Sequence, residues 1–74
     1  MFEQRTTDDL VRIAAAGGGF RLNAAMRQTN DLIIIAAAAS KKSAKIIFSG
    51  LKTRPTDDLI QIAAAGKGCV FFED

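Results

Sequence analysis

A pattern of polar and hydrophobic positions occurs three times along the chain. It starts at Arg5 (RTTDDLVRIAAAG), at Arg27 (RQTNDLIIIAAAA) and at Arg54 (RPTDDLIQIAAAG). Without gaps, the first and third copies agree at 10 of 13 positions and the second and third at 9 of 13. Successive copies start 22 and 27 residues apart, a spacing typical of repeats that hold one strand and one helix. We therefore expect the chain to arise by duplication of one structural unit.

Each copy of the pattern predicts an amphipathic helix. Hydrophobic residues recur at i, i+3 and i+4, as at Leu10, Ile13 and Ala14, which places them on one buried face. The acidic residues of the first turn suit the positive end of the helix dipole. A threonine hydroxyl can accept from a free first-turn N–H, so the predicted N-caps are Thr7, Thr29 and Thr56. A glycine closes the outer copies but not the middle one, whose helix should run about one turn longer.

A short stretch rich in β-branched or aromatic residues follows each helix and predicts a strand. The stretches are FRLNA from Phe20, KIIFS from Lys45 and CVFFE from Cys69. Matching the copies assigns one face of the sheet to Phe20, Ile46, Cys69, Leu22, Phe48 and Phe71. It assigns the other face to Arg21, Ile47, Val70, Asn23, Ser49 and Phe72.

The element order α-β-α-β-α-β predicts an α/β fold with a small parallel three-stranded sheet. Right-handed crossovers place successive helices on the same face of the sheet, so the three α-β units should stack like a solenoid with helices packed on one face. The units span about 5–26, 27–53 and 54–74 within a single domain, 1–74. A chain this small buries only about 60% of its unfolded surface, and oligomerisation is a common remedy.

One stretch resembles a known repeat family. KIIFSGLKTRPTDDLIQIAAA, from Lys45 to Ala65, contains a strand, a loop with Leu51, and Thr-Asp-Asp-Leu opening a helix. It resembles one unit of the ribonuclease-inhibitor type of leucine-rich repeat, and the resemblance covers most of the chain at low stringency. It implies a stack of strand–helix units that presents a binding surface, and it implies no functional residues.

The composition removes several classes of function. The chain has no His, the commonest general base and metal ligand, and its formal charge of +2 is small for a nucleic-acid or anionic-membrane partner. A single cysteine cannot form an internal disulfide, which favours the cytoplasm. No signal peptide is evident, and the longest apolar run, Leu32 to Ala39, is too short to span a bilayer. We therefore predict no enzyme activity, no catalytic residues, no cofactor and no metal site.

Three motifs suggest chemistry but have simpler explanations. Adjacent acidic residues, as at Asp8 and Asp9, do not point the same way on a helix, so capping explains them better than cation binding. The glycine clusters from Gly17 and from Gly66 follow helices, whereas phosphate loops precede them. Cys69 lies on the predicted core face and is expected to be a small buried hydrophobe.

The sheet face without helices predicts an interface. It would expose Ile47, Val70 and Phe72 beside Arg21, and contiguous apolar patches usually mark contact sites. The alternatives are that helices cover both faces or that the register differs by one residue. Ile34 joins this interface set because the other copies have polar residues at its position. Its alternative explanation is burial of the central helix between two neighbours.

An arginine precedes each helix at the same position, at Arg5, Arg27 and Arg54. In a stack these side chains form a row, and each could bind an acidic residue or the strand-end carbonyls of the neighbouring unit. We therefore predict an inter-repeat structural role. The alternative is a ladder that faces an acidic partner.

These expectations combine into one functional prediction. The chain begins before a helix and ends after a strand, so the last strand of one copy could meet the first helix of the next. We predict a non-enzymatic interaction module whose main partner is itself, forming a dimer, ring or filament through the open sheet face and the terminal edges. The alternatives are an adaptor or regulator that binds one other protein, and weak nucleic-acid binding through the basic stretch from Lys41 to Arg54.

Overall fold

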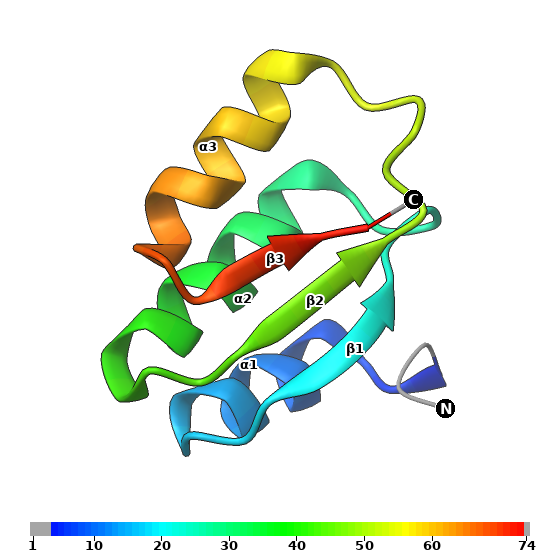
Figure 1. Ribbon diagram of the computed structural model, residues 1–74. Helices are drawn as coiled ribbons and strands as arrows, with labels where there is room; N and C mark the ends of the chain where they lie inside the picture. The colour runs from blue at the N-terminus through cyan, green and yellow to red at the C-terminus, as the bar shows by residue number, and fades with distance from the viewer. Residues whose placement is uncertain (1–3, 74) are drawn as a thin grey trace.

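The computed structural model describes residues 4–73, and its elements alternate in the predicted order (Figure 1). They are α1 (Thr7–Ala15), β1 (Phe20–Asn23), α2 (Thr29–Lys42), β2 (Ile46–Ser49), α3 (Thr56–Gly66) and β3 (Val70–Phe72). The strands form one parallel sheet in the order β1-β2-β3. The three helices lie side by side across one face of it, and no described helix covers the other face. The predicted α/β class and parallel three-stranded sheet are confirmed.

The helix starts differ from the prediction by one residue. Thr7, Thr29 and Thr56 are each the first helical residue, not the N-cap. The N-cap of α1 is Thr6, whose hydroxyl accepts from the backbone N–H of Asp9 at 3.1 Å. Gln28 and Pro55 are the N-caps of α2 and α3, and neither makes a side-chain capping bond. The capping assignment was therefore wrong because the cap position lies one residue earlier in all three helices.

The helix ends follow the glycine pattern in part. As expected from the missing glycine, α2 is the longest helix, with 14 residues against 9 in α1 and 11 in α3. Gly66 is the last residue of α3 and not the residue after it. Lys67 therefore takes the left-handed conformation, with φ 50°, as Ser43 does after α2 with φ 55°. Such C-terminal positions usually carry glycine.

The predicted register of β3 is wrong by one residue. Ile46 pairs with Val70 and Phe48 pairs with Phe72, so Val70 and Phe72 share the helix-covered face with these core residues. Phe71 lies opposite Ile47 and therefore on the open face. Val70 is half-buried and packs against the core.

The turn before β3 explains the shifted register. The N–H of Cys69 donates to the carbonyl oxygen of Gly66 at 2.9 Å, and its own carbonyl accepts from Ile46 at 2.9 Å. Cys69 therefore closes the turn and starts the ladder, while strand pairing begins at Val70.

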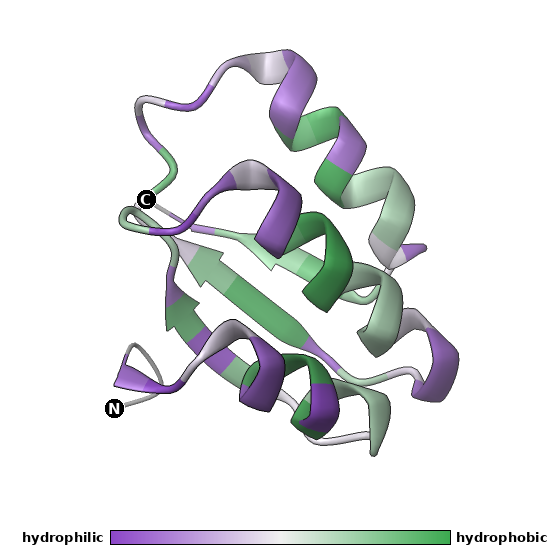
Figure 2. Cartoon of the chain, turned by 180° about the vertical axis from the view of Figure 1, so that it is seen from behind, coloured by the Kyte–Doolittle hydropathy of each residue, from purple (hydrophilic) through white to green (hydrophobic). Residues whose placement is uncertain are grey.

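The core lies between the sheet and the helix layer. The largest fully buried side chains are Leu10, Leu22, Leu32, Ile35, Ile46, Phe48 and Ile62. Alanines such as Ala14, Ala36 and Ala39 are also fully buried, and their small side chains let the helices approach one another and the sheet. Seen from the helix side, the helix starts are hydrophilic and the helix middles are mostly hydrophobic, while α2 also ends in a hydrophilic turn (Figure 2). The polar helix starts thus gather at one end of the molecule.

Candidate interaction surfaces

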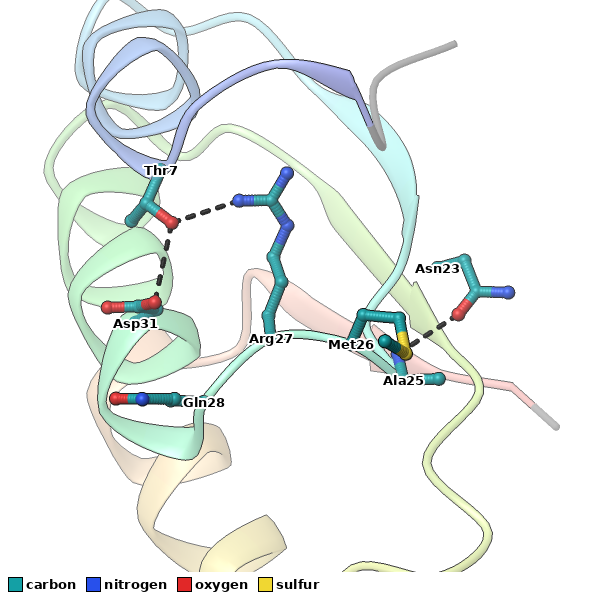
Figure 3. Close-up of a pocket in the computed structure, with 7 residues that line it drawn as sticks. All are labelled: Thr7, Asn23, Ala25, Met26, Arg27, Gln28 and Asp31. Atoms are coloured by element: carbon teal, nitrogen blue, oxygen red, sulfur yellow. Dashed lines mark hydrogen bonds between the residues drawn. The ribbon is translucent and has the colours of Figure 1, made fainter.

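A threonine connects the start of α1 to the next segment (Figure 3). The Thr7 hydroxyl accepts a hydrogen bond from Arg27 Nη1 at 2.9 Å and donates to Asp31 Oδ2 at 3.4 Å. Both partners belong to the next helix–strand segment of the chain, which contains α2 and β2. The three segments correspond to the predicted units 5–26, 27–53 and 54–74. The hydroxyl thus uses its donor and its acceptor capacity across the joint between α1 and α2.

The same arrangement recurs one segment later. The Thr29 hydroxyl accepts from Arg54 Nη1 at 2.7 Å and donates to Asp58 Oδ2 at 3.0 Å. We call this set of bonds the Arg-Thr-Asp tie. Because the donors and acceptors occupy corresponding positions in both joints, the two joints are built in the same way.

The arginines also bind backbone carbonyls in the loop before the preceding helix. Arg54 Nη2 donates to the carbonyl oxygens of Ala24, at 2.8 Å, and of Arg27. Arg27 Nη2 donates to the carbonyl oxygen of Arg5 at 2.5 Å. Arg27 and Arg54 thus connect successive segments, the role expected from their spacing, while Arg5 lies exposed at the corresponding position before α1.

One face of α1 and of α2 is directed toward the segment that follows it. In α1 this face holds Thr7, Val11 and Ala14, which are spaced i, i+4 and i+7 along one side of the helix. The corresponding residues of α2 are Thr29, Ile33 and Ala36. All six are buried or half-buried.

The matching residues of α3 are Thr56, Ile60 and Ala63, and all three are exposed, Ile60 to 58%. We call this set the α3 outer face.

The opposite face of each helix is directed toward the preceding segment. In α2 and α3 it holds the aspartate of the tie, and one turn later Ile35 or Ile62, both fully buried. The matching residues are Asp9 and Ile13 of α1 and its C-cap Ala16, and we call this set the α1 outer face. Asp9 and Ile13 are half-exposed and Ala16 is exposed. They line a shallow hollow of about 430 Å³ together with Arg5 and Arg12.

The open face of the sheet carries a further apolar area. Ile47 and Phe71 lie on it, and Phe71 is 48% exposed. Arg21 also lies there, and its guanidinium pairs with the carboxylate of Glu73. Of the predicted interface residues, only Ile47 and Arg21 lie on this face. If the alternation of core and open-face residues in β3 is counted from Val70, Phe71 falls on the open face as well.

Phe72 and Ile34 are exposed, but neither lies on the open face of the sheet. Phe72 lines a hollow of about 350 Å³ between β3 and the start of α3, with Leu59 among its neighbours. Ile34 is 44% exposed, so its two neighbouring helices do not bury it, and it lies apart from the other predicted interface residues.

A cleft of about 690 Å³ lies at the carboxyl end of β1 (Figure 3). Ligands of parallel α/β sheets commonly bind at this end. Thr7, Arg27 and Asp31 in its wall are already engaged in the tie. Asn23 Oδ1 accepts from the N–H of Ala25 at 3.0 Å. The remaining polar or large lining side chains are Met26 and Gln28.

The basic stretch from Lys41 to Arg54 is divided by the sheet. Lys41, Lys42 and Lys45 precede β2, and Lys52 and Arg54 follow it, so the two groups lie at opposite ends of that strand. Arg54 is also engaged in the tie. Lys41 and Lys42 stand in the last turn of α2, where cations complement the helix dipole. The stretch therefore does not form one continuous patch.

Three other features of residues 4–73 bear on function. Residues 4–73 contain no group of three or more Cys, Asp or Glu side chains arranged to hold a metal ion. None of the described helices has the length and apolarity required to cross a membrane. Cys69 is a free thiol, half-buried and packed against the core.

Comparison with known proteins gives no relative from which a function could be transferred. No family model, no curated protein and no solved structure matches the chain. The function must therefore be inferred from the geometry of the chain itself, in which the clearest feature is the pair of exposed outer faces on α1 and α3.

Proposed function

We propose that this chain is a non-enzymatic protein-interaction module that self-associates. The observation that carries the proposal is the exposure of the α3 outer face and the α1 outer face. Both consist of the residue types that join the helices inside the molecule, where the equivalent side chains are buried or half-buried. A further copy would let each outer face form the kind of joint that the chain already forms twice.

The sheet supports the same proposal. In the order β1-β2-β3, the outer edges of β1 and β3 have no neighbouring strand among the described residues. Open edges present backbone groups that can pair with another chain. An added copy would continue the helix layer and the sheet together, which gives the solenoid-like stack predicted from the sequence.

The expected affinity is modest. Full burial of one isoleucine side chain contributes about 1.5–3 kcal/mol, whereas association itself costs about 4–15 kcal/mol. The joint has few large side chains, with Ile60 the largest exposed one on α3. We therefore expect association in the micromolar range or weaker.

The test is mass against concentration by light scattering, from micromolar to millimolar protein. We expect the mass of the wild type to rise above 7.9 kDa with concentration. Ile60→Asp should remain at the monomer mass because it places a charge in the joint. Met26→Asp is the matched control, since Met26 is 96% exposed and lies on neither outer face. A wild type that stays monomeric at every concentration would contradict the proposal.

A second candidate function is an adaptor that binds one other protein through the open sheet face. The half-exposed Phe71 beside Ile47 favours it. In this case Phe71→Asp would abolish capture of that protein, and Ile60→Asp would not.

A further inference from the structure

We infer that copies of this chain join head to tail, with the α3 outer face of one copy seated on the α1 outer face of the next. This inference rests on the proposed function and adds to it an orientation and a set of contacts. It commits to a second copy of this chain as the occupant. The reason is that α1 carries the side chains that α2 and α3 already use to bind the helix before them.

The polar part of this joint is a third Arg-Thr-Asp tie. Thr56 occupies the position of Thr7 and Thr29, and it is an exposed residue at the start of α3. Asp9 occupies the position of Asp31 and Asp58, which accept from those threonines at 3.4 and 3.0 Å. In the head-to-tail joint, the Thr56 hydroxyl donates to Asp9 of the next copy and accepts from Arg5 of that copy.

The apolar part of the joint matches as well. Ile60 and Ala63 follow Thr56 on one side of α3 and are exposed. The α1 outer face offers a hollow of about 430 Å³ lined by Ile13 and Ala16, among other residues. Ile60 of one copy would enter this hollow, as expected from the positions of Val11 and Ile33 at the two internal joints.

The sheet edges fit the same orientation. Both strand pairs in the sheet are parallel, and each successive strand is added on the same side. A copy placed beyond α3 in the same orientation brings its β1 beside the free edge of β3, again as a parallel pair. Helix layer and sheet therefore continue together only when the copies point the same way.

A two-fold symmetric contact lacks this complementarity. If α3 packed against α3 of a second copy, each Thr56 would face a surface without the arginine and aspartate of the tie. A head-to-tail contact uses two different surfaces, so it does not close at two copies. This property provides the test of orientation.

The test combines two variants, each with one damaged face. Ile60→Asp damages only the α3 outer face, and Ala16→Arg damages only the α1 outer face, with both changes at exposed residues. Each variant alone should remain at 7.9 kDa, and an equimolar mixture should give a species of twice that mass and no larger. The pair forms because the intact α3 outer face of Ala16→Arg meets the intact α1 outer face of Ile60→Asp.

The outcomes separate the two proposals. A wild type that never associates overturns the proposed function and this inference with it. A wild type that associates while Ala16→Arg associates equally well overturns the head-to-tail orientation alone. So does a mixture that stays monomeric.

Thr56→Val tests the tie within the joint. It keeps the shape of the side chain and removes the hydroxyl, so association should weaken by roughly tenfold or more, as for loss of a bond to a charged group. Its unfolding midpoint at low concentration should equal that of the wild type. The matched change Thr29→Val removes an internal tie and should lower that midpoint. Unchanged association in Thr56→Val would overturn the third tie.

Discussion

The threonine that opens each helix can use its hydroxyl in two ways. At the N-cap it would satisfy a backbone N–H of its own helix, and one position later it can reach a neighbouring segment. Thr7 and Thr29 take the second course and bind an arginine and an aspartate of the segment that follows. The local pattern around them is the same for both uses. Which use the hydroxyl takes depends on the distance to the next helix. This distance cannot be predicted from a single copy of the pattern.

Lys67 offers a direct prediction at the residue scale. Its left-handed φ of 50° is costly for a residue with a side chain. Lys67→Gly should therefore raise the free energy of unfolding by roughly 0.5–1 kcal/mol in urea denaturation, because the cost of about 1–2 kcal/mol that this conformation carries for other residues exceeds the extra backbone entropy that glycine loses on folding. The control is Lys42→Gly, in the last helical position of α2, which should lower it. A loss of stability in Lys67→Gly would contradict the described end of α3.

At the scale of elements, the sequence predicts the helices better than the last strand. The helices follow from the repeated Leu, Ile and Ala positions, which agree in all three copies. In β3 the residues Cys69 and Val70 are both small and hydrophobic, so either could start the buried alternation. An edge strand also has only one neighbour to fix its register. The hydrogen bonds of Cys69 to Gly66 and to Ile46 fix the register, and these bonds depend on the fold of the turn.

The register of β3 has a measurable consequence. Val70 packs toward the core and Phe71 lies on the open face. Val70→Asp should therefore lower the free energy of unfolding by about 2 kcal/mol or more, because it puts a charge against buried side chains. Phe71→Asp, the matched change one residue later, should cost much less. The reverse ranking in urea denaturation would restore the register predicted from the sequence.

For the whole molecule, the order of elements and the one-sided helix layer could be predicted because the same sequence pattern occurs three times. The α1 and α3 outer faces could not be predicted from the repeated pattern. Ile60 corresponds to the half-buried Val11 and Ile33, and nothing in its own segment distinguishes it from them. Its exposure follows from the place of α3 at the end of the helix layer.

Self-association should also appear in thermal unfolding. A contact that forms only between folded copies stabilises the folded state by mass action. The melting temperature of the wild type should therefore rise with protein concentration, and that of Ile60→Asp should not change. Scanning calorimetry at several concentrations checks this, and a constant melting temperature for the wild type would contradict it.

The one-sided placement of the helices determines the shape that a continued stack would take. Neighbouring strands lie about 4.8 Å apart and packed helices about 8–10 Å apart, with layers separated by about 10 Å. Because the helix layer needs more room per segment than the sheet, each segment would be rotated from the last by roughly 25°. The stack would bend into an arc whose concave side is the open sheet face with Phe71. A full circle would take on the order of five copies, so electron microscopy of concentrated protein should show small curved or closed particles, not straight fibres.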